Sequence, residues 1–295
     1  MRVFVTGASG FIGSAVTREL QAAGHEVVGL ARSEAAAATI EAAGAEVVRG
    51  DLTQPETLRA PASQADAVIH LAFDHDFSRF ADHCAVELRA IDALGDALAG
   101  TKKLLIVTSG VGMVRIHGRP ATESDAAATD GSFPRTPERA AEAARQRGVR
   151  VAIVRLPQVH DTRHAGLVSF VIELARQKGY VAYVGDGSNH WSAAHVSDVA
   201  RLYRLALEKN AEGRYHAVAE EGVPLRTIAK VVAEGLGVPA RSISAAEAPG
   251  YFGWMGGLAS EDIRATSLET RAALGWEPRG PGMLADLETR EWAPA

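Results

Sequence analysis

Short apolar runs alternate with longer segments of helical period through the first half of the chain. The runs are rich in Val, Ile and Leu, as in strands that are buried on both faces. They occupy residues 2–6, 26–31, 46–49, 67–71, 103–108 and 149–155. Helical spacing predicts helices over residues 11–23, 33–43 and 80–98. Because strands and helices alternate at these lengths, the pattern predicts βαβ units and a doubly wound, parallel α/β sheet.

Turn and capping residues divide the chain further. Gly24 and Gly44 are placed to end two of the helices. Residues 53–56 have the pattern of a capping box, with a proline in the first turn. Residues 111–135 interrupt the alternation, and beyond Pro157 it becomes irregular. We therefore expect a larger domain over 1–160, to which 190–220 returns, and a smaller C-terminal substrate lobe over 161–295.

A glycine-rich turn links the first strand to the first helix. The glycines are spaced GxxGxxG, which allows a tight turn and close packing of helix on strand. Backbone N–H groups at the start of such a helix can bind a pyrophosphate. The position after a strand and before a helix favours a dinucleotide site. The residues expected to contact the cofactor here are Gly7, Ser9, Gly10, Phe11, Ile12 and Gly13.

The ends of the second and third strands indicate which dinucleotide is bound. Arg32 and Ser33 follow the second strand, where NAD-binding proteins tend to carry Asp or Glu. An arginine can instead bind the 2′-phosphate of NADP, so we predict NADP(H) as the cofactor. Asp51, with Leu52 beside it, is placed to accept a hydrogen bond from the adenine amino group. The alternatives are a solvated Arg32 and an Asp51 that only begins a turn.

These motifs together resemble the extended short-chain dehydrogenase/reductase family, which includes nucleotide-sugar epimerases. The matching segments are TGASGFIG at 6–13, GDL at 50–52, HLA at 70–72, VRLP at 154–157, and GDG with HVSDVA at 185–200. The resemblance implies a Rossmann fold and suggests a homodimer formed through residues 80–98 and 135–147. It also implies cofactor contacts from Leu71, Ala72 and Phe73, with Pro157 near the nicotinamide.

The chain departs from this family at its catalytic pair, a Tyr and a Lys spaced YxxxK. The first tyrosine is Tyr180, and no lysine lies between Lys103 and Lys178. The family's proton donor therefore cannot be transferred to this sequence. Arg135 and Arg139 have the same spacing in the expected helix. We expect them to be solvated helix charges, with contact to a ribose or phosphate as the alternative.

Other polar residues remain as candidates for catalysis. Ser109 is the nearest match to the family's catalytic serine, although Gly110 is the alternative in that register. His75 lies between two aspartates after the fourth strand and titrates near neutral pH. A second polar cluster, His160, Asp161, Arg163 and His164, follows the sixth strand. Each of these groups has a purely structural role as its alternative.

Composition and charge narrow the function classes. The chain has 31 basic and 36 acidic residues among 295, a net charge of −5, which argues against nucleic acid as the partner. Because Cys84 is the only cysteine, an intrachain disulfide cannot form. We expect Cys84 to be buried. No spacing matches a zinc motif, and no segment predicts a membrane helix. We expect a cytoplasmic protein with neither a metal nor a membrane partner.

The sequence therefore predicts an NADP(H)-dependent oxidoreductase that transfers hydride to or from a small carbonyl or hydroxyl compound. The uncharged segment Pro249–Leu258 and Trp191 favour an apolar substrate, although both are also consistent with ordinary packing. Two alternatives remain: a non-catalytic NADP(H)-binding sensor, and an epimerase that uses bound NAD. The first would explain the missing YxxxK pair, and Arg32 argues against the second.

Overall fold

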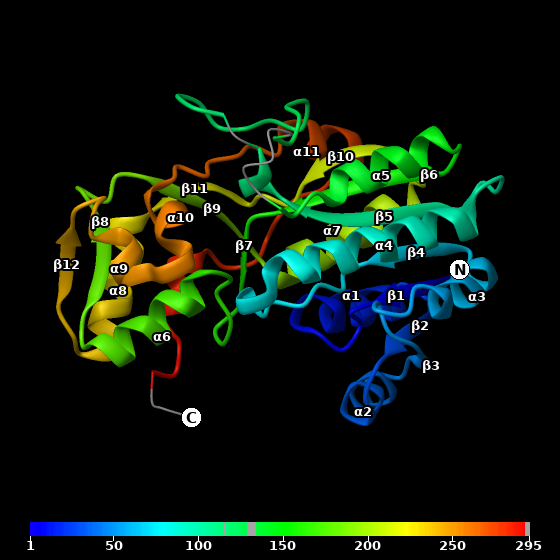
Figure 1. Cartoon of the computed structure of the whole chain (residues 1–295), viewed down its shortest axis with the longest axis horizontal. Helices are drawn as coiled ribbons and strands as arrows, with labels where there is room; N and C mark the ends of the chain where they lie inside the picture. The colour runs from blue at the N-terminus through cyan, green and yellow to red at the C-terminus, as the bar shows by residue number, and fades with distance from the viewer. Residues whose placement is uncertain (115, 129–133, 293–295) are drawn as a thin grey trace.

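A parallel sheet forms the centre of the larger part of the molecule (Figure 1). The computed structural model describes residues 1–114, 116–128 and 134–292. Within this part of the chain the sheet has seven strands in the order β10-β6-β5-β4-β1-β2-β3, all parallel. Their bounds are β1 Arg2–Thr6, β2 Glu26–Ala31, β3 Glu46–Arg49, β4 Ala67–His70, β5 Leu104–Gly110, β6 Arg150–Leu156 and β10 Gly213–His216. The predicted doubly wound α/β fold is confirmed.

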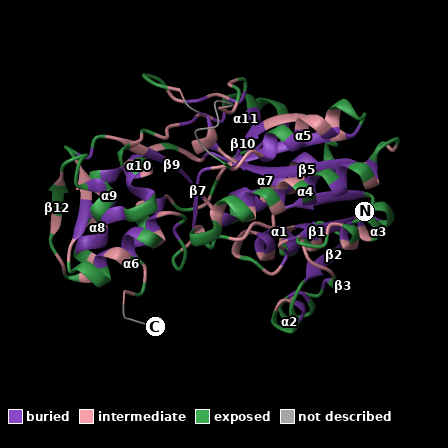
Figure 2. Cartoon of the chain, viewed as in Figure 1, coloured by how far each residue is buried: buried purple, intermediate pink, exposed green. Residues whose placement is uncertain are grey.

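Helices cover both faces of this sheet. Alternate strand residues point to opposite faces, so Val3 and Val5 join one core and Phe4 joins the other, all fully buried. α1, α2 and α7 pack on the first face, and α3, α4 and α5 on the second. Figure 2 shows the sheet buried between these layers. The helices are α1 Phe11–Ala22, α2 Glu34–Ala42, α3 Glu56–Gln64, α4 Phe80–Leu98, α5 Pro137–Gln146 and α7 Val196–Glu208.

Most predicted elements lie within two residues of their expected bounds. The prediction of a capping box at residues 53–56 is wrong. α3 begins only at Glu56, with Pro55 at its N-cap and no side-chain cap. The N–H and hydroxyl of Thr53 instead donate to Oδ1 of Asp51, at 2.8 and 2.9 Å. Asp51 thus holds Thr53 in a turn before the helix, and the hydroxyl is unavailable as a cap.

A second hydrophobic core organises the C-terminal lobe, which we define as α6, β8, α8, β12, α9, η3, α10 and α12 (Figure 1). Small sheets of order β11-β9-β7 and β12-β8 accompany it. The strands are β7 Gln158–His160, β8 Val181–Val184, β9 His190–His195, β11 Glu220–Pro224 and β12 Ala240–Ile243. The helices are α6 Val168–Lys178, α8 Leu225–Leu236, α9 Ala248–Phe252, η3 Gly253–Met255, α10 Gly256–Ser260 and α12 Met283–Glu288.

Several segments of the second half of the chain belong to the large sheet. β10 is one of its two edge strands, and α7 packs against α1. Leu274, which ends α11 (Leu268–Leu274), and Trp276 are buried in the same core. The domain bounds 1–160 with 190–220, and 161–295, stay a prediction.

The aromatic segment Pro249–Leu258 divides between two environments. Tyr251, Phe252 and Met255 are buried in the second core, as ordinary packing predicts. Trp254 is exposed. Trp191 is fully buried in the second core, so it fills the lobe interior.

Two further expectations concern single features of the chain. Cys84 is buried, as predicted, and burial raises the pKa of its thiol to about 11. The irregular segment 111–135 contains a short helix, η2 Val111–Met113, while residues 115 and 129–133 lie outside the described residues. Among the described helices none is long and apolar enough to cross a membrane.

Candidate cofactor and active site

The glycine turn brings three backbone segments into contact. Gly7 has φ +72°, and a Cβ there would lie 2.8 Å from the backbone nitrogen of Ala72 after β4. A Cβ on Gly13 would overlap the carbonyl oxygen of Gly7. The N–H of Gly10 donates to that same oxygen at 3.0 Å and fixes the turn. Only glycine fits at positions 7 and 13, so α1 starts directly against the end of β1.

The start of α1 is a cradle suited to an anion. Gly10 is the N-cap and supplies no side-chain acceptor to the first-turn N–H groups. These N–H groups and the helix dipole favour negative charge at this point. The ring of His164, from the loop after β7, stacks on Phe11 with centroids 4.2 Å apart. Residues of the turn therefore fit a dinucleotide pyrophosphate, and the loop after β7 lies beside them.

The end of β2 carries a charge pair. Arg32 is largely exposed, and its Nη1 donates to Oδ2 of Asp74 at 3.3 Å. A hydrogen bond from the Asp76 N–H, aided by Arg32, lowers the pKa of Asp74. Ser33 is the N-cap of α2, accepting from Ala36, while Glu34 pairs with Arg49 at 2.6 Å. The end of β2 therefore presents Arg32 with Asp74 beside it, an acid that comes from the segment after β4.

Asp51 lies at the end of β3, at the side of the sheet where an adenine is expected. Its Oδ1 accepts two hydrogen bonds from Thr53, which fix the carboxylate in one orientation. Leu52 packs partly against the core beneath it. The adenine contact of Asp51 stays a prediction, now with an oriented carboxylate.

A buried pair ties the end of β4 to the glycine turn. The hydroxyl of Thr6 lies 2.8 Å from Nδ1 of His70 and accepts from the Ala72 N–H at 3.3 Å. Burial, with the Arg135 charge, lowers the pKa of His70 to about 3. His70 is therefore neutral, and one hydrogen bond joins its Nδ1 to the Thr6 hydroxyl. The pair holds Leu71, Ala72 and Phe73 above the turn.

Ser109 belongs to a buried ionic network under α5. Its hydroxyl donates to Oε1 of Glu138 at 2.8 Å. Arg155 donates to both oxygens of Glu138, each at 2.8 Å, and also contacts Nε2 of His216 at 3.1 Å. Ser109, Arg155 and His216 are paired across β5, β6 and β10, so all three side chains share one face. The hydroxyl of Ser109 is thus committed to Glu138.

Arg135 is not a solvated helix charge, and the expectation for it is wrong. α5 begins at Pro137, so Arg135 precedes the helix, although Arg139 is exposed as expected. The guanidinium of Arg135 donates to Glu87 of α4 at 2.6 and 3.0 Å and lies 4.2 Å above the Phe73 ring. Glu87 is buried, so its charge draws Arg135 into the protein.

His75 lies in an aromatic environment between Phe73 and Phe77. The ring centroids are 5.1 and 6.1 Å from that of His75. These apolar surroundings lower the pKa of His75, and the Arg135 charge lowers it further, although the residue still reaches solvent. His75 and Ser109 belong to separate contact networks, one above the sheet edge and one beneath α5.

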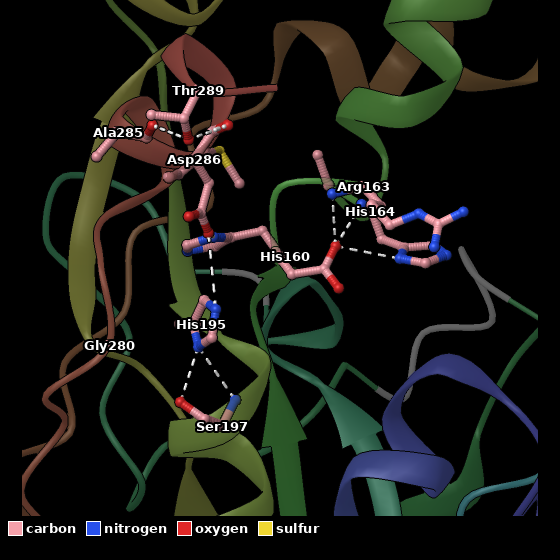
Figure 3. Close-up of polar contacts among 12 residues, drawn as sticks. His160, Arg163, His164, His195, Ser197, Gly280, Ala285, Asp286 and Thr289 are labelled. Atoms are coloured by element: carbon pink, nitrogen blue, oxygen red, sulfur yellow. Dashed lines mark hydrogen bonds and ion pairs between the residues drawn. The ribbon is translucent and has the colours of Figure 1, made fainter. Parts of the chain in front are cut away.

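The second polar cluster divides into two groups (Figure 3). Nδ1 of His160 lies 2.7 Å from Oδ2 of Asp286, on which His195 also converges at 3.9 Å. Asp161 instead accepts from the backbone of Arg163 and His164, at 2.7 and 2.6 Å. His160 therefore anchors α12 to β7, whereas Asp161 shapes the loop that carries His164 to Phe11.

The sequence analysis missed Glu138 and Glu87, and it did not foresee that Asp74 pairs with Arg32. The signal for Glu138 was indirect: Arg155 follows the apolar run 151–154 within one strand, and a buried charge requires a partner. A surface hollow of about 510 Å³ lies elsewhere, beside β10. Its lining includes Arg145, Arg214 and Glu269, away from the glycine turn.

The nucleotide cradle agrees with the comparison to known families. Residues 3–219 match the model of the NAD dependent epimerase/dehydratase family, and the chain belongs to that family. The chain has the NAD(P)-binding fold of this family. Its sequence contains no Tyr and Lys with the spacing YxxxK.

Relatives of similar length are known in yeasts. The chain is 42% identical to an uncharacterized protein of Schizosaccharomyces pombe, over 97% of this chain and 98% of the relative. A second uncharacterized protein, from Saccharomyces cerevisiae, is also 42% identical, with the same coverage. The 2′-dehydrokanamycin reductase of Streptomyces kanamyceticus is 31% identical over 83% of this chain and 69% of that protein.

Solved structures share the fold at lower identity. The DesIV dTDP-glucose 4,6-dehydratase of Streptomyces venezuelae, with NAD and TYD bound, superimposes with a TM-score of 0.79. The two are 20% identical, and the match covers 99% of this chain and 96% of that one. A UDP-glucose 4-epimerase of Thermus thermophilus in complex with NAD has a TM-score of 0.78 at 22% identity, over 99% of both chains.

Replacing Gly13 should remove dinucleotide binding. In Gly13→Ala the new methyl group meets the Gly7 carbonyl, so α1 must move away from the turn. We expect NADPH affinity, measured by calorimetry, to fall at least about tenfold. Gly257→Ala is the matched control, because nothing lies within 4 Å of its new Cβ. Equal affinity in both variants, with both folded by circular dichroism, contradicts the cradle.

Removing the Glu138 charge should destabilise the fold. Glu138→Gln leaves Arg155 buried without a counter-charge, which costs about 3–5 kcal/mol of unfolding free energy. Glu142 lies on the same helix in a partly exposed pair with Arg145, so Glu142→Gln should cost under about 1 kcal/mol. Urea denaturation measures both values. A similar small cost for the two variants would show that the buried pair is energetically neutral.

Proposed function

We propose that the protein is an NADP(H)-dependent reductase of a small, apolar carbonyl compound. The observation that carries this proposal is the preformed backbone cradle at Gly7 and Gly13, with Arg32 at the adenosine end. The name of the Streptomyces kanamyceticus relative, a reductase, supports the direction of reaction. Bound NADPH would supply a hydride; the chain supplies binding, orientation and a proton.

Arg32 is the residue we propose to read the 2′-phosphate. Its guanidinium already lies at the end of β2 and is exposed, so it can form two hydrogen bonds to a phosphate. Nη1 of Arg32 donates to the Asp74 carboxylate at 3.3 Å, and this carboxylate would repel the 2′-phosphate of a bound NADP(H). The pair thus orients Arg32 but opposes the phosphate electrostatically. Gly10, Phe11 and their neighbours would bind the pyrophosphate, and Asp51 the adenine.

We propose His75 as the proton donor that replaces the missing tyrosine. It lies on the segment that Thr6 and His70 hold above the glycine turn, and its ring reaches solvent. A protonated imidazole there can give its proton to the substrate oxygen as hydride arrives on the carbon. Asp74 precedes it and favours the protonated form. Solvent then reprotonates the ring.

Ser109 stays a proposed contact to the substrate oxygen, with a condition. The Ser109 hydroxyl now donates its hydrogen bond to Oε1 of Glu138 at 2.8 Å. It must release Glu138 before it can donate to a substrate oxygen. The hydrogen bond to Glu138 also favours the alternative of a non-catalytic NADP(H)-binding sensor. A sensor would bind the cofactor without turnover, so NADPH oxidation across a panel of carbonyl compounds separates the two functions.

A homodimer formed through α4 and α5 and a cytoplasmic location are proposed on the family resemblance and the composition. Sedimentation of the purified protein measures the first, and fractionation of the source cells the second.

Cofactor choice can be tested at the charge pair. Arg32→Ala should weaken NADPH binding about tenfold or more and leave NADH binding nearly unchanged. Asp74→Asn should tighten NADPH binding, because it removes a carboxylate beside the phosphate while keeping the side-chain size. Calorimetry with each cofactor gives the values. Equal losses for NADPH and NADH in Arg32→Ala would refute the 2′-phosphate contact.

The pH dependence of the reaction tests His75. Its pKa lies below the ordinary 6.5, and reduction needs the protonated ring. We therefore expect kcat/KM for carbonyl reduction to fall as pH rises through that lowered pKa. His75→Gln should remove this limb and lower kcat/KM about 100-fold. The control is His25→Gln, at the opposite end of β1 beside Met1. A pH profile retained in His75→Gln excludes the residue as proton donor.

A further inference from the structure

Aromatic rings from both parts of the molecule meet in one cluster. Phe77, in the short helix η1 (Phe77–Arg79) before α4, stacks on Trp254 of the C-terminal lobe. The centroids are 3.7 Å apart and the planes differ by 12°. Phe170 of α6 meets both rings edge-on, at 5.4 and 5.6 Å. The stack is therefore a contact between the lobe and the sheet domain, supported by a third ring.

Two of these rings are unusually exposed. Trp254 is 47% and Phe170 36% accessible, whereas Trp191 and Trp276 are fully buried. Exposed apolar side chains that form a contiguous patch mark an interaction surface, and Trp254 and Phe170 are in contact with each other. Tyr251, Phe252 and Met255, which flank Trp254 in sequence, are all buried. These buried neighbours anchor the segment in the lobe core, whereas the Trp254 side chain lies at the surface.

Two of the three rings follow segments that contact the glycine turn. Phe77 lies four residues after Phe73. The Phe73 ring packs under Arg135, and the neighbouring Ala72 backbone lies against Gly7. Phe170 follows six residues after His164, which stacks on Phe11 of the glycine turn. In Figure 1, α4 starts at the end of the sheet that faces α6 and α10. Phe77 and Phe170 therefore each follow a segment that contacts the glycine turn.

Carboxylates border the stack. Arg79 pairs with Asp82 at 3.1 Å, and Asp74 pairs with Arg32 at 3.3 Å. Asp76 directly precedes Phe77 and is exposed. The negative charge of these carboxylates disfavours an anionic ligand beside Phe77, such as a sugar nucleotide or a carboxylate.

We propose that Phe77 and Trp254 form an aromatic clamp that takes a planar, uncharged ring of the substrate between their faces. The stack seen here is its closed state, in which each ring occupies the place of the ligand. The inference rests on the proposed reductase function and names its substrate class: carbonyl compounds conjugated to a flat ring. Ring stacking rewards planarity, so a saturated ring of equal size gains less.

Calorimetry on the full-length protein, with and without saturating NADP⁺, tests the clamp. The probes are 2-acetylnaphthalene and its saturated counterpart, 2-acetyldecalin, which differ mainly in ring planarity. Trp254→Leu keeps an apolar side chain but loses the stack, and Trp254→Phe keeps a ring. Trp292→Phe is the matched control, since Trp292 lies against Gly235 of α8.

We expect the wild type to bind 2-acetylnaphthalene about tenfold tighter than 2-acetyldecalin. Trp254→Leu should abolish this preference, Trp254→Phe should keep most of it, and Trp292→Phe should keep it all. Equal binding of the two probes by the wild type, no binding of either, or a preference that survives Trp254→Leu overturns the clamp.

NADPH oxidation with the same two ketones separates the clamp from the reductase. Turnover of both ketones without preference leaves the reductase standing and removes the clamp. Preferential binding of 2-acetylnaphthalene with no NADPH oxidation leaves the clamp standing and removes the reductase.

Discussion

The backbone of Gly7 touches two other backbones at once, and the functional architecture depends on these contacts. The Gly7 carbonyl oxygen accepts a hydrogen bond from the Gly10 N–H and leaves no room for a side chain at Gly13. A side chain on Gly7 itself would collide with the backbone of Ala72. β1, α1 and the end of β4 are thereby locked at one point. This point sets where a dinucleotide can lie and where the segment after β4 begins. Asp74 and Phe77 lie on the segment that follows β4 at this point, and Arg32 pairs with Asp74.

Polar groups on the carboxyl edge of the sheet are largely committed to one another. Thr6 binds His70, and Ser109 and Arg155 converge on Glu138, all of them buried. Paired charges tolerate burial, whereas free ones do not, so the Glu138–Arg155 pair can be buried at this edge. On the loops above the edge, Arg32 and His75 are exposed. The chain lacks a YxxxK pair, and its helix α5 contributes Glu138 to this buried network.

Ring contacts join the two parts of the molecule on either side of the cradle. His164 stacks on Phe11, and Trp254 stacks on Phe77. Neither contact involves a buried charge or a covalent link, so both can open at modest cost, since a single aromatic pair contributes about 0.5–1.5 kcal/mol beyond burial. A site bounded by separable stacks can admit a ligand while the two hydrophobic cores stay intact.

The sequence alone determined the sheet, the glycine turn and the family, because these depend on local period and on glycines at fixed spacing. Strand β1 and helix α4 have the predicted bounds, and the absence of YxxxK is visible in the letters. Tertiary structure decided which charges meet. Arg135 was expected in solvent, yet Glu87, 48 residues away, draws it inward. Asp74 reaches Arg32 across 42 residues, and Trp254 reaches Phe77 from the other lobe. Such contacts depend on how distant segments pack, and no local pattern in the chain records them.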